Sequence, residues 1–195
     1  MFFDVGANVG QSVDRIRTYF DHPVIHSFEP SPETFVRLQE AAWNIADVTL
    51  NNIALGRKSG TAELVENTDP ALSSLLEPGP DIWGSMKRKT TITVSTLDEY
   101  CTQNSIGHID VLKLDTQGFE LDVLHGAETL FSEGRVGAVF MEITLSEMYK
   151  GLPRLDELYR FMIERGFVLV AFYDFHYQKN RLGWCDALFA RRAEG

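Results

Sequence analysis

The segment Phe2-Phe3-Asp4-Val5-Gly6-Ala7-Asn8-Val9-Gly10-Gln11-Ser12 decides the fold, because its pattern changes from strand to turn to helix. Residues 2–5 form a short apolar run, and residues 9–20 place apolar side chains at helical spacing. Gly6 and Gly10 permit a sharp turn and the close approach of a ligand. The helix N-terminus that follows offers free N–H groups to a nucleotide-like ligand, and a purely structural turn is the alternative.

The same alternation of short apolar runs and amphipathic stretches continues along the chain. Strands are predicted at residues 24–28, 48–55, 61–65, 91–94, 109–114 and 136–143. Helices are predicted after the cap residue Ser31 and at residues 96–101, 119–131 and 155–163. Two β runs, 167–173 and 184–189, close the chain without a helix between them. Strand–helix alternation implies crossovers and parallel strands. We therefore expect an α/β, Rossmann-like, mostly parallel sheet of seven strands, with a C-terminal antiparallel hairpin and helices on both faces.

One segment departs from this pattern. Residues 66–89 contain three prolines and show too little periodicity for a regular element. A loop of that length in a compact domain is usually functional or mobile, and a disordered insertion is the alternative. At 195 residues the chain has the length of one domain. We expect a single domain over residues 1–195, with 66–89 as a long variable loop.

Charge and composition exclude several classes of protein. Lys and Arg number 18 against 28 Asp and Glu, which leaves a formal net charge of −10. This balance argues against a protein that binds the phosphate backbone of nucleic acid, and a solvated loop explains the basic triplet 87–89 equally well. No apolar stretch approaches the roughly 18 residues of a membrane span, and the N-terminus lacks signal-peptide features. Cys101 and Cys185 are isolated, as reduced thiols of a cytoplasmic protein are.

An acidic residue narrows the class of ligand. Glu29, in Phe28-Glu29-Pro30, follows an apolar run and lies 19 residues after Gly10. A carboxylate in that place accepts hydrogen bonds from both ribose hydroxyls in dinucleotide-binding folds. The turn reads G-x-N-x-G and so departs from the G-x-G-x-x-G pattern of NAD sites. S-adenosylmethionine carries no phosphate and therefore needs less clearance from the backbone than NAD. Its sulfonium is positively charged, which suits an acidic site.

Further motifs carry a resemblance to a known family. The pattern D-V-G-A-N-x-G followed by F-E-P is similar to the first two motifs of class I S-adenosylmethionine-dependent methyltransferases. The second half adds L-D-E-Y at 97–100, I-D-V-L-K-L-D-T-Q-G-F-E at 109–120 and V-L-H-G-A-E at 123–128. From Asp4 to about residue 190 the chain resembles the FkbM family. Gln117 stands where Glu is common. The chain opens on its first strand, where family members usually carry further residues, so an N-terminal cap is expected to be absent or trimmed.

The resemblance implies S-adenosylmethionine as cofactor and assigns residues to it. The glycine-rich turn would hold the methionine part, Glu29 the ribose, and the residues after the second and third strands the adenine. Asp115 would lie beside the transferred methyl group, and Gln117 would continue that turn. The cofactor-binding residues expected on this basis are Asp4, Gly6, Asn8, Gly10, Glu29, Pro30, Ser31, Asn52, Ala54, Asp115 and Gln117.

Three residues are the candidates for the transfer itself. Asp115 is the candidate base, because a hydroxyl acceptor has a high pKa and benefits from one. Lys113, two residues earlier on the same strand face, is expected to pair with Asp115, bind substrate or pack in the sheet. Glu142 ends the fifth strand, so it faces the same edge as Asp115. Two carboxylates suit Mg²⁺ or Ca²⁺, but no third ligand is identified and no metal site is predicted. Glu120 caps the next helix or serves the site.

The sequence defines the residues that would bind the acceptor less well than those that would bind the cofactor. Tyr149, just after the fifth strand, is a candidate pocket wall, and His176 lies in an aromatic-rich segment expected to be a turn. His176 lines the acceptor pocket, or its turn packs on itself. The expected function is O-methylation of a hydroxyl on a small molecule or glycan, without a nucleic-acid partner. The alternatives are a nicotinamide-dependent oxidoreductase and a non-catalytic module that binds the cofactor or a partner.

Overall fold

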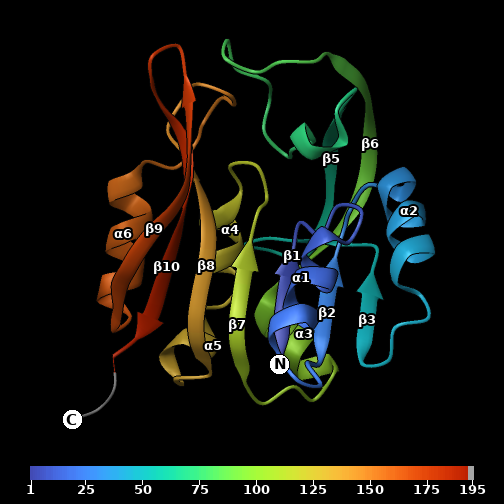
Figure 1. Ribbon diagram of the computed structural model, residues 1–195, viewed down its shortest axis with the longest axis vertical. Helices are drawn as coiled ribbons and strands as arrows, with labels where there is room; N and C mark the ends of the chain where they lie inside the picture. The colour runs from blue at the N-terminus through green and yellow to red at the C-terminus, as the bar shows by residue number, and fades with distance from the viewer. Residues whose placement is uncertain (193–195) are drawn as a thin grey trace.

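A seven-stranded sheet forms the centre of the computed structural model, which describes residues 1–192 (Figure 1). Its strands lie in the order β3-β2-β1-β7-β8-β10-β9. The first five of these are mutually parallel, and β10 runs antiparallel to both β8 and β9. The expected mostly parallel sheet with a C-terminal antiparallel hairpin is confirmed. The strand bounds are β1 Phe2–Val5, β2 Ile25–Phe28, β3 Val48–Asn51, β7 Ile109–Leu114, β8 Val136–Thr144, β9 Phe167–Gln178 and β10 Arg181–Arg191.

Alternation along β1 assigns the helices to two faces of the sheet, since successive strand side chains point to opposite sides. Phe2 packs with Val13 of α1 (Gln11–Tyr19), on the face that also carries α2 (Pro32–Ala42). Phe3 belongs to the main core, to which the helices of the opposite face contribute. Those are α3 Leu97–Gln103, α4 Glu120–His125, α5 Glu128–Ser132 and α6 Leu155–Glu164. Among residues 1–192, no helix combines the length and the apolar character needed to cross a membrane.

Capping residues in the sequence predicted the starts of α2 and α3 correctly. The Ser31 hydroxyl accepts a hydrogen bond from the Thr34 N–H at 3.3 Å, and Pro32 occupies the first turn of α2. At α3 the Thr96 side chain accepts from the Glu99 N–H at 3.1 Å. Each cap satisfies an N–H group that the helix itself leaves unpaired.

A second sheet of three strands was not expected. It has the order β4-β6-β5, with β4 Ala54–Leu55, β5 Gly60–Asn67 and β6 Met86–Ser95. The single strand predicted at 48–55 is wrong, because β3 pairs with β2 whereas β4 pairs with β6. The break falls at Asn52, whose amide donates to the carbonyls of Glu29 and Pro30.

Residues 66–89 are more regular than their sequence indicates. β5 extends into the segment, β6 begins within it, and a 3₁₀ turn, η1, spans Pro70–Leu72. The first part of β6 is exposed on both faces and polar, so it shows no apolar alternation. Pairing with β5 defines this strand instead, and a periodicity argument cannot detect that.

Two further elements differ from expectation. The helix predicted at 119–131 is interrupted between α4 and α5 by Gly126, where a Cβ atom would lie 2.1 Å from the Gly56 carbonyl oxygen. The last two strands are longer than predicted and meet in a turn at Lys179 and Asn180, both with positive φ, as two-residue hairpin turns require. His176 therefore lies in β9 rather than in a turn, and that placement was wrong.

The end of β1 packs so closely on the end of β7 that residue 6 must be glycine. Gly6 has φ +84°, and a Cβ atom there would lie 1.9 Å from the Asp115 carbonyl oxygen. We predict that Gly6→Ala lowers the free energy of unfolding by about 2–5 kcal/mol through left-handed strain and overpacking. Urea denaturation measures this. Gly107→Ala, where an added Cβ meets nothing within 4 Å, is the control, and equal midpoints for the two variants would contradict the prediction.

Candidate active site

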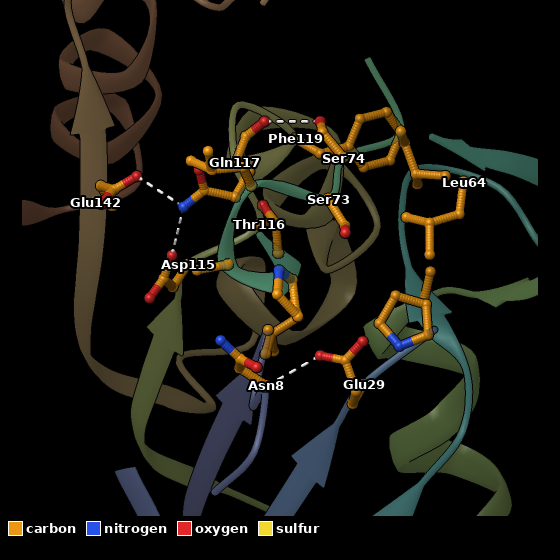
Figure 2. A pocket seen from close by; sticks show the side chains of 18 of the residues that line it. Asn8, Glu29, Leu64, Ser73, Ser74, Asp115, Thr116, Gln117, Phe119 and Glu142 are labelled. Atoms are coloured by element: carbon orange, nitrogen blue, oxygen red, sulfur yellow. Dashed lines mark hydrogen bonds between the residues drawn. The ribbon is translucent and has the colours of Figure 1, made fainter. Parts of the chain in front are cut away.

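A cavity of about 260 Å³ opens at the carboxyl ends of β1, β2, β7 and β8 (Figure 2). It lies where the strand order reverses between β1 and β7, and ligands bind at such points in open α/β sheets. Elements far apart in sequence therefore meet around one space. The expected site residues that line it are Gly6, Asn8, Glu29, Pro30, Ala54, Asp115, Gln117 and Glu142.

The other expected residues lie just outside this lining. Gly10 adopts φ +98° at the start of α1, and Ser31 caps α2. Asn52 holds the backbone of Glu29 and Pro30. Asp4, Lys113, Tyr149 and His176 stand behind lining residues, as described below.

The segment between β5 and β6 forms one wall of the cavity, which the sequence did not reveal. The Ser74 hydroxyl donates to the Gln117 carbonyl oxygen at 2.8 Å, and the Tyr149 hydroxyl lies 3.2 Å from the Leu72 carbonyl oxygen. These contacts hold the segment against the ends of β7 and β8. The signals in the sequence were its length, its prolines and its lack of periodicity, which indicated a functional or mobile loop but not its place in the fold. Lining residues not predicted include Leu64, Leu72, Ser73, Ser74, Trp83, Phe119 and Trp184.

Glu29 is a buried carboxylate held by two backbone groups. One of its oxygens accepts from the Asn8 N–H at 3.0 Å and the other from the Ser31 N–H at 2.9 Å. Burial raises the pKa of Glu29 to about 7, although these two bonds favour its charged form. The carboxylate thus connects the glycine-rich turn to the start of α2, and each oxygen retains a lone pair for a ligand.

Lys113 lies between two carboxylates. Its Nζ atom is 3.0 Å from the Asp4 Oδ1 atom and 3.5 Å from the Asp115 Oδ2 atom. Burial alone would lower the pKa of Lys113, but the charges of Asp4 and Asp115 outweigh it and raise that pKa. Of the roles expected for Lys113, pairing with Asp115 is present. Its ammonium stays charged, which makes it a positioning group for Asp115 rather than a base.

Gln117 joins the two candidate catalytic carboxylates (Figure 2). Its Nε2 atom donates to the Asp115 Oδ1 atom at 2.9 Å and to the Glu142 Oε1 atom at 3.1 Å. Its Oε1 atom accepts from the buried Tyr149 hydroxyl at 2.9 Å, so Tyr149 stands behind Gln117. Gln117 adopts φ +55°, a sparsely populated conformation that is typical of functional turns.

Acidic neighbours act strongly on Glu142. Burial and then the Asp115 carboxylate raise its pKa well above the usual range. Asp186 lies directly opposite Glu142 in the β8–β10 pairing, and burial raises the pKa of Asp186 to about 6. The sequence did not single out Asp186, because only the register of the hairpin places it beside Glu142.

Glu120 and His176, two further candidates for the site, have structural roles instead. Glu120 accepts hydrogen bonds from the Thr116 N–H at 2.8 Å and the Gly118 N–H at 3.2 Å, so it caps the turn before α4. The His176 ring stacks on Trp184 with ring centroids 4.9 Å apart. His176 therefore supports a lining residue and does not line the cavity itself.

The arrangement of possible metal ligands and of the two cysteines is as follows. Within residues 1–192, no group of three or more His, Cys, Asp or Glu side chains is arranged to hold a metal ion. Cys101 and Cys185 are free and buried, and burial raises the pKa of Cys101 to about 11. Neither thiol has the low pKa of a nucleophilic cysteine.

The sequence profile of the FkbM methyltransferase domain matches residues 4–169. This chain belongs to the FkbM methyltransferase family. The 2-O-methyltransferase NoeI of Sinorhizobium fredii is 21% identical over 162 residues, which are 77% of this chain and 66% of that protein. The hexuronic acid methyltransferase AglP of Haloferax volcanii is 28% identical over 130 residues, 65% of this chain and 49% of that protein. The FkbM chain thus spans about two thirds and one half of these relatives.

Solved structures share the fold of this FkbM domain. The magnesium protoporphyrin IX methyltransferase ChlM of Synechocystis, with bound S-adenosylmethionine, has a TM-score of 0.55 at 10% identity, covering 98% of this chain and 70% of that one. The TrmK protein of M. capricolum, with S-adenosylhomocysteine, has a TM-score of 0.55 at 7% identity, covering 97% and 61%. Both likenesses confirm the Rossmann-like class.

S-adenosylmethionine is the cofactor of a methyltransferase family, and the residues present fit it. The Asn8 Oδ1 atom is buried and accepts no hydrogen bond within residues 1–192, and Asn8 lines the cavity. The Asp4 carboxylate lies behind the lining and pairs with Lys113. Glu29 adds a carboxylate with free lone pairs. The cofactor offers the matching donors, an ammonium group and two ribose hydroxyls. Gly6 and Gly10 contribute no side chain at two positions of the adjoining turn.

Gln117 offers a test of this electrostatic arrangement. We predict that Gln117→Glu raises the pKa of Glu142 further, with about tenfold tighter proton binding, because a third carboxyl replaces the amide that donates to both acids. NMR titration of the Glu142 carboxyl carbon measures this without any activity assay. Gln39→Glu, on the exposed face of α2, is the matched control, and an unchanged titration of Glu142 would contradict the prediction.

Proposed function

We propose that this domain transfers a methyl group from S-adenosylmethionine to a hydroxyl oxygen of a small molecule or glycan. The observation that carries the proposal is the meeting of Asp115 and Glu142, bridged by Gln117, on the cavity wall next to the glycine-rich turn. Family membership supports methyl transfer. NoeI is named as a 2-O-methyltransferase, which supports an oxygen acceptor. AglP is named as a hexuronic acid methyltransferase, which supports an acceptor of sugar type.

Each part of the cofactor has proposed partners. Glu29 accepts from the ribose hydroxyls, and the turn at Gly6, Asn8 and Gly10 surrounds the methionine part, with Asp4 beneath it. Around the adenine lie Pro30, Ser31, Asn52 and Ala54. Ala54 would act through its backbone, because its side chain belongs to the small core of the second sheet.

The reaction needs little beyond positioning and a base. S-adenosylmethionine supplies an activated methyl group when bound. Asp115 is 40% exposed and would accept the hydroxyl proton as the acceptor oxygen bonds the methyl carbon, while the methyl–sulfur bond breaks and S-adenosylhomocysteine leaves. Lys113 and Gln117 hold the two Asp115 oxygens in place. Holding the reactants in line supplies much of the rate, and base assistance contributes about 10²–10⁴-fold.

The alternatives differ in support. The family match is to a methyltransferase domain, so a nicotinamide-dependent oxidoreductase is not favoured. A non-catalytic binding module would make the same cofactor contacts as an active methyltransferase. Only a measurement of turnover distinguishes the two. A cytoplasmic location is part of the proposal and rests on two free cysteines, as expected of a reducing compartment.

Cofactor binding tests the assignment of Glu29. Calorimetric titration with S-adenosylhomocysteine should show about ten- to hundredfold weaker binding for Glu29→Ala, because charge-assisted hydrogen bonds are lost. The affinity of the unmodified domain should fall as the pH drops below about 7, since protonation of Glu29 removes the charged acceptor. Glu40→Ala on the exposed face of α2 is the control, and NADH is the ligand control. Equal affinity of Glu29→Ala and Glu40→Ala, both folded, would refute the assignment.

Turnover tests the role of Asp115. We predict that Asp115→Asn keeps the affinity for S-adenosylhomocysteine within about threefold and loses about 10²-fold or more in transfer rate. Transfer of a labelled methyl group to a panel of alcohols and sugars measures it. Asp122→Asn on α4, whose carboxylate pairs with Arg57 at the surface, is the control. Cofactor binding without transfer to any hydroxyl by the unmodified domain would favour the binding module.

A further inference from the structure

We propose that the acceptor is an uncharged sugar, in contrast to the hexuronic acid for which the relative AglP is named, and that the site rejects sugars that carry a carboxylate, sulfate or phosphate. The inference rests on the proposed function and names the substrate class of the same site. It follows from the charges that line the cavity, from the pairing of the cations around it and from an aromatic wall.

The lining of the cavity is acidic. Its charged residues are Glu29, Asp115 and Glu142, and no Lys, Arg or His of residues 1–192 lines it. Glu29 stands at the cofactor end, which leaves Asp115 and Glu142 for the acceptor (Figure 2). Recognition of an anionic sugar uses cationic side chains, Arg above all, and the lining offers none.

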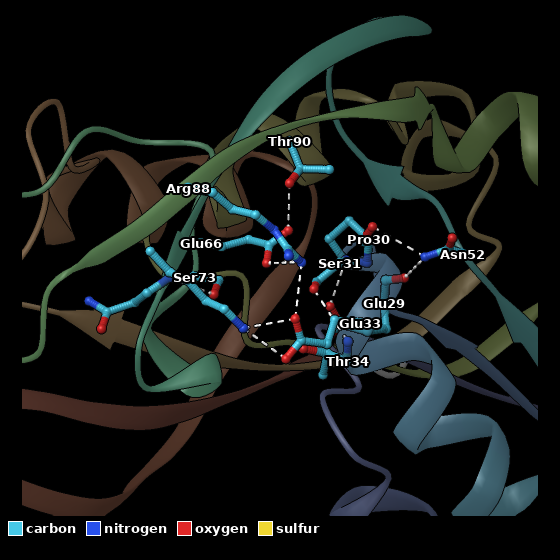
Figure 3. A network of polar contacts seen from close by, with 12 residues as sticks. Glu29, Pro30, Ser31, Glu33, Thr34, Asn52, Glu66, Ser73, Arg88 and Thr90 are labelled. Atoms are coloured by element: carbon cyan, nitrogen blue, oxygen red, sulfur yellow. Dashed lines mark hydrogen bonds and ion pairs between the residues drawn. The ribbon is translucent and has the colours of Figure 1, made fainter.

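Two cations on the elements around the cavity, Lys113 and Arg88, are already paired. Lys113 lies between Asp4 and Asp115, and Arg88 of β6 pairs with Glu33 and with the buried Glu66 (Figure 3).

The other cations of the basic triplet 87–89, and two cations of the β9–β10 hairpin, are also paired with carboxylates. Lys87 pairs with Glu33, and Lys89 pairs with Glu77. At the hairpin tip, Lys179 and Arg181 both pair with the buried Asp81. To neutralise an anionic acceptor, one of these cations would have to leave its carboxylate partner, and three of those partners, Asp4, Glu66 and Asp81, are buried.

The neighbours of Glu142 increase the repulsion of an anion. Asp186 faces Glu142 across the β8–β10 pair, and Asp115 is connected to Glu142 through Gln117. These carboxylates already disfavour the charged form of Glu142. A further anion in the acceptor position would meet the same repulsion, and like-charge contacts are an effective means of excluding a wrong partner.

Two tryptophans, with ring planes tilted by 35°, give the cavity an aromatic wall. Trp184 and Trp83 both line the cavity, with ring centroids 5.5 Å apart, and His176 stacks on Trp184 at an interplanar angle of 9°. An indole packs against the C–H face of a pyranose, while paired carboxylates accept hydrogen bonds from neighbouring hydroxyls. This combination of aromatic wall and acceptor oxygens suits a neutral sugar.

A panel of matched methyl glycosides tests the inference on the unmodified domain. Each neutral sugar is paired with its uronic acid, and transfer of a labelled methyl group is compared at equal concentration. We expect the neutral member to be preferred by about 100-fold in kcat/KM. Asp186→Lys should reduce this preference about tenfold or more by placing a cation beside Glu142. Asp14→Lys, on the exposed side of α1, controls for net charge.

Trp184 supplies a second readout. Trp184→Ala should raise KM for the neutral sugar about tenfold with unchanged affinity for S-adenosylhomocysteine, and Trp184→Phe should restore most of the loss. Equal or better transfer to the uronic acids would overturn the inference and leave the proposed function intact. Transfer to simple alcohols alone would overturn the sugar class. Absence of transfer to every hydroxyl would overturn the proposed function, and the inference with it.

Discussion

The contact between the ends of β1 and β7 is the constraint on which the rest of this structure depends. Gly6 follows β1 and lies against the Asp115 carbonyl that follows β7. Two residues earlier on each strand, the buried Asp4 carboxylate meets its register partner Lys113 at 3.0 Å. Removing one partner of a buried ion pair leaves an uncompensated charge. Packing and charge therefore hold the two strand ends together, and the cavity opens where they meet.

The acidic character of the site follows from that geometry. Parallel strands bring their carboxyl ends to one edge, and in this chain those ends carry Glu29, Asp115 and Glu142. Gln117 separates the last two acids with an amide that donates to both. A carboxylate in this place would add to the repulsion, so glutamine at this position lets Asp115 and Glu142 share one wall.

The second sheet shows how a site can be completed by a segment with a weak sequence signal. β5 and β6 carry η1 and Trp83 over the cavity. The hydrogen bond from Ser74 connects this segment to the turn after β7, and the contact of Leu72 with Tyr149 connects it to the segment after β8. Its stability comes from these tertiary contacts and from pairing between its own strands, since much of its surface is exposed and polar.

The sequence by itself determined the alternating fold, the helix caps at Ser31 and Thr96, and the acid at Glu29 that follows its strand. These features depend on periodicity and on hydrogen bonds between residues close in the chain, which a local pattern records. Only the tertiary structure decided that β4 leaves the main sheet, that His176 lies in a strand, and that Asp186 and Trp184 adjoin the cavity. Those outcomes depend on which distant strands pair and in which register, and a one-residue shift would turn every side chain to the other face.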